Sequence, residues 1–432
     1  MQPSLDQLLL QAVQQFDWES IYDYDYSHFL TRPPHLDLAV ILFPSTGDPV
    51  FSNVLLSPAC PQGHLVTIEP ETLQTRGIHW RQDVGNWDNS QTPDTAPTLW
   101  DPGQATIDFT CPYPASVLKL MVGIGILRLV DAGQITLHEV WEYDGDPTDM
   151  GRNFESHPIQ IWLEMMLCLS DDRATCALIL LLHQHGILTP EGTPPDHPLN
   201  HLFQTLGLST LQLNDTRRSD GSFLNRAGSG VGHIHMTAWD SIRLLWLLDP
   251  NAPRPRWIGA EGQLVDPDQL LSPGSRAFLV NRLMAQQGFH EMLSTTLLCG
   301  FPDISPGIPS LVPDRWIAAD GSITLQDNQD LQPYSRNIRP CNDKAEVTFA
   351  HKTGLTANYG SNIGIVRGIP ERGHHRHYLI ALFSNLGYRY TSTHQPGDRA
   401  YASGFERLVW YPQQIPTLGS RLDQGIKKLL GS

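Results

Sequence analysis

Lysine is scarce in this sequence. Only five of the 29 basic residues in the 432-residue chain are lysines, so the other 24 are arginines. Arginine stays protonated in proteins, whereas a desolvated lysine can lose its proton and serve as a base. Two of the five lysines, Lys119 and Lys352, lie at interior, motif-like positions. This distribution favours a chemical role for these two residues.

The chain also lacks a basic surface, a membrane span and an export signal. Its net charge of −16 disfavours binding to nucleic acid or to an anionic membrane. The longest apolar runs, near 178–182 and 244–248, are far too short to span a bilayer. The first residues contain no basic region, long apolar region or small-residue cleavage site. We therefore expect a soluble, cytoplasmic protein, unless a leader precedes this sequence.

Neither cysteine nor histidine shows the spacing of a metal site. The histidine-rich segments 233–235 and 374–377 have no cysteine or carboxylate partner at ligand spacing, so we expect solvated histidines there. The cysteines form no CxxC pair, so buried, reduced thiols are expected. No metal and no organic cofactor is predicted. The six cysteines are at positions 60, 111, 168, 176, 299 and 341.

Hydrophobic periodicity predicts a mixed α/β protein in which two groups of strands flank a helical middle. Thr237 and Ser272 are the expected N-caps of the last two helices in that middle. The predicted elements are a helix over 5–16, strands over 36–43 and 50–56, helices over 115–132, 159–185 (broken near 168–171), 199–206, 233–248 and 272–287, strands over 346–353, 360–368 and 377–385, and a helix over about 400–410.

Helices inserted between the two halves of a sheet indicate an α/β sandwich built from discontinuous chain. We therefore predict an α/β subdomain formed by 1–110 and 345–432, and a mainly helical subdomain formed by 111–344. Residues from about 58 to 105 and from about 300 to 344 are rich in Pro, Asp and Asn without clear periodicity. They are predicted to be two loop-rich insertions.

Three segments carry groups suited to acyl transfer. The sequence YPASVLK at 113–119 places Ser116 at a helix start with Lys119 one turn later, on the same face. A helix N-terminus favours a developing oxyanion, and a neutral lysine can take the serine proton. Alone, this spacing also fits an ordinary helix cap with a surface lysine. The segment 170–172, Ser-Asp-Asp, follows at a helix break, and 351–354, His-Lys-Thr-Gly, ends a strand to whose edge a substrate can add.

With these three segments the chain resembles the penicillin-recognising serine enzymes, the class A β-lactamases and DD-peptidases. In that family, the motifs SxxK, SDN and KTG follow one another in the same order. The sequence around each motif is similar too. The resemblance spans residues from about 5 to 410, apart from the two insertions. It implies an antiparallel sheet flanked by helices, with an all-helical subdomain. The similar stretches are 113–137, 168–182, 235–248 and 351–367.

The resemblance also implies residue roles. Ser116 would be acylated, with Lys119 as its base or as the hub that orients it, and Ser170 would relay a proton to the leaving group. Lys352 and Thr353 would hold a substrate carboxylate, and Lys352 would help to keep Lys119 neutral by like-charge repulsion. The backbone N–H groups of Ser116 and Leu355 would form the oxyanion hole. The substrate-binding positions would be Asp172, Thr353, Gly354, Leu355 and Thr356.

Two positions depart from the family pattern. Asp172 replaces the usual Asn, and an ionised Asp only accepts hydrogen bonds. Either the substrate presents an N–H or a cation there, or Asp172 is protonated, or it simply replaces Asn as a lysine partner. The omega-loop glutamate that activates the deacylating water has no counterpart within 216–232. Asp220 is the nearest carboxylate for deacylation, or it is only a turn residue beside Gly221.

The sequence thus predicts a serine hydrolase that acylates Ser116 with a small or peptide-like amide or ester and releases the acyl group to water or another acceptor. Because the deacylating glutamate is absent, a peptidase, amidase or esterase fits better than an efficient β-lactamase. Two alternatives stay open: an acylatable binding or sensor module, and an inactive pseudoenzyme of the same fold. Neither the natural substrate nor the oligomeric state follows from the sequence.

Overall fold

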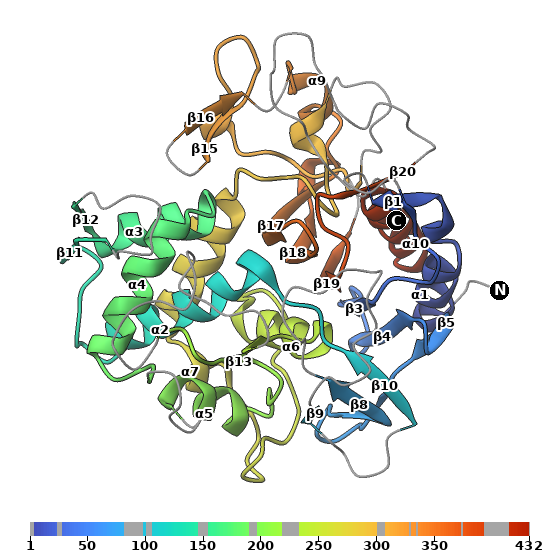
Figure 1. The fold of residues 1–432 in the computed structure, drawn as a ribbon, viewed down its shortest axis with the longest axis horizontal. Coiled ribbons are helices and arrows are strands. Elements are labelled where there is room, and N and C mark those ends of the chain that lie inside the picture. The colour runs from blue at the N-terminus through green and yellow to red at the C-terminus, as the bar shows by residue number, and fades with distance from the viewer. Residues whose placement is uncertain are drawn as a thin grey trace.

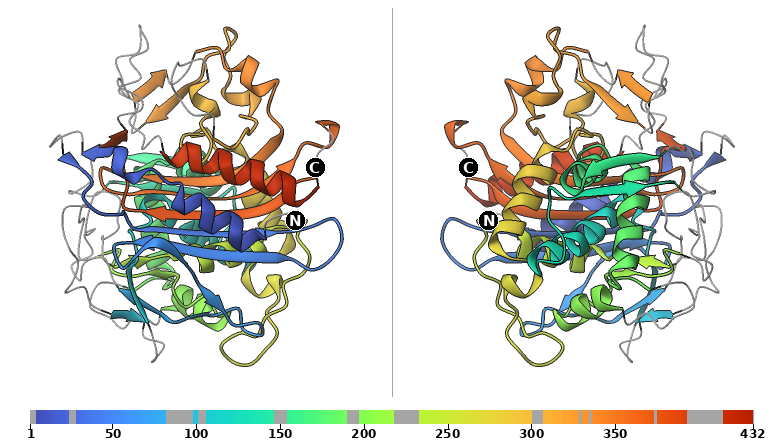
Figure 2. Two further views of the ribbon diagram at one scale, coloured as in Figure 1. Left: turned by 90° about the vertical axis from the view of Figure 1, so that its right-hand side faces the viewer. Right: turned by 90° about the vertical axis from the view of Figure 1, so that its left-hand side faces the viewer.

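The computed structural model describes most of the chain as a mixed α/β fold. One large sheet lies between a region of many helices on one face and two terminal helices on the other (Figure 1, Figure 2). The described residues are 4–23, 28–81, 98–100, 106–145, 154–189, 197–217, 233–299, 307–327, 330–333, 336–372, 375–392 and 414–431.

Six antiparallel strands form the central sheet in the order β17-β18-β19-β3-β4-β5. The N-terminal strand β3 pairs with the C-terminal strand β19, with Leu38 opposite Leu382. The two predicted groups of strands therefore form one sheet, and the predicted antiparallel α/β fold class is confirmed. The strands are β3 (Leu36–Leu42), β4 (Val50–Ser57), β5 (Cys60–Leu65), β17 (Val347–Leu355), β18 (Gly360–Gly368) and β19 (His377–Ser384).

Both faces of this sheet are buried, and alternate residues of one strand belong to different cores. In β3, Val40 packs in the core formed with α1 (Leu5–Gln14) and α10 (Gln414–Leu429). Its neighbour Ala39 packs in the core formed with the helical region. Successive side chains of a strand point to opposite faces, so a strand covered on both sides needs an unbroken apolar run.

The helical region covers the second face of the sheet. Helix α6 packs against β3, β18 and β19, and its first N–H, at Ala238, donates to the Asp37 carboxylate of β3 at 2.7 Å. Burial raises the pKa of Asp37 to about 6. The helices are α2 (Lys119–Asp131), α3 (Ile159–Cys168), α4 (Asp172–Gln184), α5 (Pro198–Thr205), α6 (Ala238–Leu248), α7 (Pro267–Leu270) and α8 (Pro273–Ala277).

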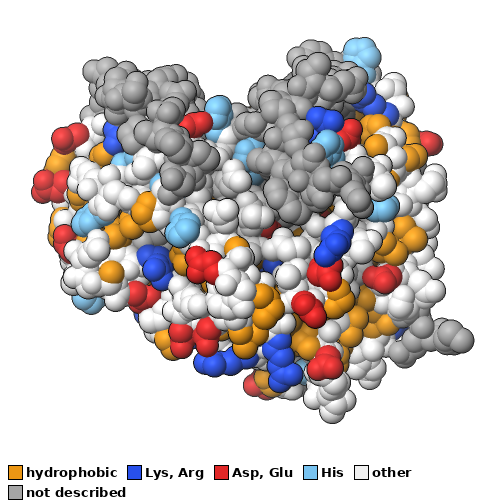
Figure 3. Space-filling model, turned by 90° about the horizontal axis from the view of Figure 1, so that it is seen from below, with side chains coloured by type: hydrophobic (Ala, Val, Ile, Leu, Met, Phe, Trp, Pro, Cys, Tyr) orange, Lys and Arg blue, Asp and Glu red, His pale blue; other side chains and the backbone are white. Residues whose placement is uncertain are grey.

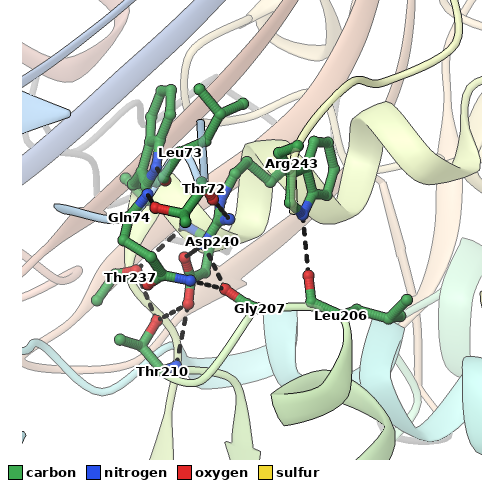
Figure 4. A network of polar contacts seen from close by, with 12 residues as sticks. Thr72, Leu73, Gln74, Leu206, Gly207, Thr210, Thr237, Asp240 and Arg243 are labelled. Atoms are coloured by element: carbon green, nitrogen blue, oxygen red, sulfur yellow. Dashed lines mark hydrogen bonds and ion pairs between the residues drawn. The ribbon is translucent and has the colours of Figure 1, made fainter. Parts of the chain in front are cut away.

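A buried polar network fastens the first insertion to this region (Figure 4). Arg243 and Asp240 of α6 form a buried ion pair. Arg243 also donates to the backbone oxygens of Gly207 at 2.7 Å and Thr72 at 3.3 Å. Thr210 donates to Asp240 through its N–H at 3.0 Å and its hydroxyl at 2.7 Å. Because the opposite charges are paired and hydrogen-bonded, both can be buried.

Most predicted elements are present, but three helices differ. Thr237 and Ser272 are N-caps, as predicted. However, the helix predicted from 233 begins only at Ala238, after a two-stranded sheet of β13 (Gln212–Leu213) and β14 (Ile234–His235). The helix predicted over 272–287 becomes a π-helix at Phe278–Leu283 and a 3-10 turn at its end. The helix predicted over 400–410 lies outside the described residues, and α10 was not predicted.

The insertions contain more regular structure than predicted. In the first, β8 pairs with β9 and, in parallel, with β10. In and next to the second, the described residues within 289–344 form what we call the lobe, at the top of Figure 1. The lobe has its own core of Phe289, Leu297, Val312, Ile323, Leu325 and Ile338. The elements are β6 (Thr67–Ile68), β7 (Thr75–Arg76), β8 (Ile78–Arg81), β9 (Thr98–Trp100) and β10 (Ile107–Thr110), then β15 (Thr324–Asp327), β16 (Asp330–Pro333) and α9 (Arg339–Asn342).

A disulfide joins Cys299 to Cys341 across the lobe. The prediction of six reduced thiols is therefore wrong for these two cysteines, because the folding of the lobe brings together residues that are 42 positions apart. It holds for the other four, Cys60, Cys111, Cys168 and Cys176, which are buried and form no disulfide.

Two smaller sheets complete the described fold. One has the order β2-β1-β20, and the other is the pair β11 and β12. On the face shown in Figure 3, the described Lys and Arg side chains lie scattered among Asp and Glu. Across the described ranges, no helix is long and apolar enough to cross a membrane. The strands are β1 (Ile21–Asp23), β2 (His28–Phe29), β20 (Tyr390–Ser392), β11 (Val140–Tyr143) and β12 (Glu155–Pro158).

Candidate active site

Ser116 lies in a short 3-10 turn, Ala115–Leu118, that leads directly into α2. The preceding residue, Ala115, has a φ of +48°. A non-glycine residue in this region is strained, and such residues cluster at functional sites. The turn packs against β17, where a side chain at Gly354 would collide with Pro114 O and come within 3.0 Å of Ser116 N. The glycine of the third motif thus lets the strand contact the backbone of the serine turn.

The second motif forms the junction between α3 and α4. Ser170 has a φ of +59°, and Asp171 caps α4 by accepting from Ala174 N at 2.7 Å. Burial raises the pKa of Asp171. Of the two aspartates, Asp171 is therefore structural. Asp172 begins α4, and its side chain is 42% exposed at the site.

Lys119 connects the first motif to the second. Its side chain is only 1% exposed. Its ammonium donates to the backbone oxygen of Ser170, to Ser170 Oγ at 3.2 Å and to Asp172 Oδ1 at 2.6 Å. A lysine has three N–H donors, and these three contacts use all of them. Asp172 thus acts as a lysine partner, which is one of the three alternatives that the sequence leaves open.

Lys352 brings the third motif to the same serine. It is fully buried and donates to Ser170 Oγ at 2.9 Å and to Thr353 O at 2.9 Å. Burial lowers the pKa of Lys352 well below its usual value, and the charge of Lys119 lowers it further. Two ammonium groups that share one hydroxyl oxygen repel each other, so the site favours the loss of a proton.

Asn362 of β18 fixes the backbone at Lys352, and sequence reasoning missed it. Its Nδ2 donates to Lys352 O at 3.0 Å, while its Oδ1 accepts from Leu293 N at 3.2 Å. The side chain is fully buried. The signal available was an amide directly before the apolar residues of the strand 360–368, since a buried polar side chain needs partners.

Only part of the edge strand β17 is accessible for backbone pairing with a substrate. Leu311 N donates to Val347 O at 2.9 Å, so the lobe covers the start of this strand. Thr353 is buried, whereas Leu355 and Thr356 are partly exposed at the other end, next to the Ser116 turn. Four of the predicted substrate-binding positions, 353–356, therefore lie at the end of the edge strand away from its contact with the lobe, whereas Asp172 lies at the start of α4.

Lys119, Ser170, Asp172 and Lys352 are in direct contact, and Gly354 packs against the Ser116 turn. Within the described residues, no hydrogen bond joins Ser116 Oγ to Lys119. Catalytic hydrogen bonds, such as one between Ser116 and Lys119, often form only when substrate is bound. Asp220 lies outside the described residues.

The histidine-rich segments are less solvated than predicted. His235 is buried, and burial lowers its pKa to about 3. His233 contacts Asp215 at 2.6 Å, and His377 contacts Asp249 at 2.7 Å, whereas His374 lies outside the described residues. The prediction of solvated histidines is thus wrong for His235 and His377. Among the residues that the structure describes, no group of three or more His, Cys, Asp or Glu is placed to hold a metal ion.

No protein-family model and no curated protein sequence matches this chain. Among solved structures, it is similar to the structure of PBP-A at 15% identity, over 99% of this chain and 100% of that one, with a TM-score of 0.47. A β-lactamase from Sphaerobacter thermophilus aligns at 11% identity over 98% and 97%, with a TM-score of 0.44. One from Chitinophaga pinensis aligns at 13% identity over 92% and 94%, with a TM-score of 0.40. No residue role follows from similarity at this level.

Proposed function

We propose that this protein is a serine hydrolase that forms an acyl-enzyme on Ser116. The observation that carries the proposal is the pair of buried lysines, Lys119 and Lys352, that donate to one oxygen, Ser170 Oγ. Two buried cations side by side cost stability, and a lysine pKa lowered by burial, as at Lys352, is typical of catalytic sites. The strained turn at Ala115, directly before the serine, supports the same conclusion.

The proposal implies a sequence of proton transfers. In its neutral form, Lys119 takes the proton of Ser116 Oγ as that oxygen bonds to the substrate carbonyl carbon. The N–H groups of Ser116 and Leu355 stabilise the oxyanion. When the bond to the leaving group breaks, Ser170 gives that group its hydroxyl proton. The Lys119 ammonium, 3.2 Å from Ser170 Oγ, then restores the proton. Water or another acceptor finally attacks the acyl carbon, its proton passes to neutral Lys119, the bond to Ser116 Oγ breaks, and Lys119 returns the proton to Ser116 Oγ.

The substrate that fits best is a small or peptide-like amide or ester with a carboxylate. Lys352 and Thr353 would bind the carboxylate, and the backbone at Leu355 and Thr356 would pair with the substrate as an added strand. Asp172 accepts from Lys119 and offers no donor of its own. It therefore disfavours a carbonyl at this position and favours an N–H or a cation. The chain division into 1–110 with 345–432 and 111–344 would place the site between subdomains.

A second candidate function, an acylatable sensor, is favoured by one contact. Asp172, a carboxylate of the described site, is already engaged by Lys119 at 2.6 Å. If no other group activates water, the acyl-enzyme persists and the chain acts as a sensor or waits for another acceptor.

We also propose that the protein works in an oxidising compartment rather than the predicted cytoplasm, because the Cys299–Cys341 disulfide is typical of such compartments.

The test is intact-protein mass spectrometry during incubation with a fluorescent penicillin and, separately, with a small activated ester. Wild type is compared with Ser116→Ala and with Ser322→Ala, a change at a turn of the lobe. A mass increment in wild type and Ser322→Ala but not in Ser116→Ala supports the nucleophile. Its decay over hours indicates turnover, whereas its persistence indicates the sensor. No increment from either probe contradicts the proposal.

A further inference from the structure

The position of the Leu355 backbone depends on the turn that follows it. Strand β17 ends at Leu355, which pairs with Gly360 at the start of β18. Between them, Thr356 N donates to Tyr359 O at 2.9 Å, and Tyr359 N donates to Thr356 Oγ1 at 3.2 Å. This tight turn lies at the edge of the sheet, beside the Ser116 turn.

The segment after β19 braces this turn from outside. Tyr388 N donates to Thr356 O at 2.9 Å, and Arg389 N donates to Ala357 O at 3.2 Å. Gly387 lies so close that a side chain there would collide with the backbone oxygens of Thr356 and Ala357. Only glycine permits this approach. The turn is therefore held by backbone contacts to a segment distant from it in sequence.

The Arg389 side chain adds a charged link to the same brace. Its Nη1 donates to Asn358 Oδ1 in the turn at 2.9 Å. Its Nη2 lies 3.1 Å from Asp23 Oδ2, and its Nε lies 3.4 Å from Asp23 Oδ1. The Arg389 and Asp23 side chains are only 10% and 11% exposed. Asp23 is itself fixed, because β1 pairs with β20 and sets Asp23 opposite Tyr390.

We propose that Arg389 is a positioning residue that holds the Leu355 N–H in place for the oxyanion, with Asp23 as its anchor. The guanidinium spans two elements in a fixed fork, and each of its partners is itself held by strand pairing or by a turn. Loss of the fork removes the Arg389 contact from Asn358 and leaves the Asp23 carboxylate buried without this cation. The inference rests on the proposed function, because it assigns the oxyanion contact to Leu355.

The variants Arg389→Ala, Arg389→Lys and Asp23→Asn test this role, with Arg276→Ala as the matched control. Arg276 is a similarly buried arginine, 12% exposed, that pairs with Asp268 away from the site. Acylation by an activated ester is followed over a range of ester concentrations to separate the binding constant from the acylation rate constant. We expect Arg389→Ala to lower the rate constant at least tenfold, with binding changed less than threefold. Added guanidinium at non-denaturing concentration restores part of the rate.

Hydrogen exchange measures the positioning without any substrate. In Arg389→Ala the backbone amides of 355–359 are expected to exchange at least tenfold faster than in wild type, whereas in Arg276→Ala they exchange at the wild-type rate. Unchanged exchange in Arg389→Ala overturns the inference, whether or not Ser116 is acylated. An unchanged acylation rate constant overturns it as well. If wild type is never acylated, the proposed function fails, and hydrogen exchange alone decides whether Arg389 positions the turn.

Discussion

Lys119 and Lys352 donate to the same hydroxyl oxygen, Ser170 Oγ, at 3.2 and 2.9 Å. They come from α2 and from β17, so the shared serine joins the helical region to the edge of the sheet. Removing either lysine leaves the other with one cation fewer nearby. The charge of Lys119 therefore helps to lower the pKa of Lys352, and the burial of both side chains makes the site costly to fold.

Lys352→Met is expected to stabilise the protein at pH 7 while it slows acylation. Because the folded-state pKa of Lys352 is lowered, the unfolded chain binds more protons between that pKa and the usual lysine value. Lys352 thus costs stability at neutral pH, and the cost disappears as the pH rises toward the usual value. We expect a gain of about 1 to 2 kcal/mol in urea denaturation at pH 7 and acylation slower by on the order of 100-fold. A loss of stability at pH 7 would contradict the assignment.

Asp172→Asn is expected to change substrate preference. Asn keeps an oxygen for Lys119 and adds an N–H donor that the aspartate lacks. Acylation by a penicillin with an acylamido carbonyl should rise about tenfold relative to acylation by an ester without one, a change of about 1.4 kcal/mol. Asp171→Ala is the contrasting change, because it removes the α4 cap and should cost about 1 kcal/mol of stability. An unchanged ratio of the two acylation rates in Asp172→Asn would count against a substrate contact at this position.

Strands were the easiest elements to predict because the apolar residues that mark each strand lie close together in the sequence. The predicted strand over 360–368 has the ends observed for β18, since Gly360 and Gly368 flank a short run centred on Ile363, Ile365 and Val366. The break before α4 was also predictable, because Ser170 and Asp171 favour a cap over a helix interior. In contrast, Thr237 was correctly predicted as a cap, but the sequence before it gave no sign that β14 would pair with β13.

The site was predictable where its residues lie within short motifs, and not where they depend on distant chain. Asp172 and Lys352 were both expected at the site. Asp172 contacts Lys119, and Lys352 contacts Ser170. Arg389 was not expected, because its partner Asp23 is 366 positions away and no spacing indicates the pair. The Cys299–Cys341 disulfide was missed for the same reason. Long-range pairings depend on packing that local patterns do not encode.

Removal of the disulfide is expected to destabilise the lobe. Denatured protein without reductant should expose four reactive thiols, and all six should react after reduction. Cys341→Ser should cost about 2 to 4 kcal/mol, because the unfolded chain gains the freedom of an unclosed loop. Leu169 packs against the lobe core directly before Ser170, so acylation of Ser116 should slow as well. Cys60→Ala, at a free buried thiol, is the control that should keep the wild-type response to reductant. Six reactive thiols before reduction would refute the disulfide.

Stability is expected to fall as the pH decreases from about 6.5 to 4. Burial lowers the pKa of His35 and His235 to about 3, that of His183 and His290 to about 4, and that of His351 well below its usual value. In this range the unfolded chain therefore takes up protons at these five histidines that the folded chain does not bind, and stability falls. Asp37, whose pKa is raised to about 6, opposes this by roughly one proton, because its folded carboxyl protonates first.

This net uptake predicts that stability, measured by urea denaturation, falls between pH 6 and 5, and each histidine that stays neutral in the folded protein contributes about 1.4 kcal/mol per pH unit to the slope. His290→Asn retains a polar partner for Ser310, which the imidazole contacts at 2.8 Å. This change should reduce the slope by about 1.4 kcal/mol per pH unit. His138→Asn, at an exposed position, should leave it unchanged. A slope that is the same in both variants would mean that His290 does not stay neutral in the folded protein, and the acid sensitivity would then have to come from groups other than this histidine.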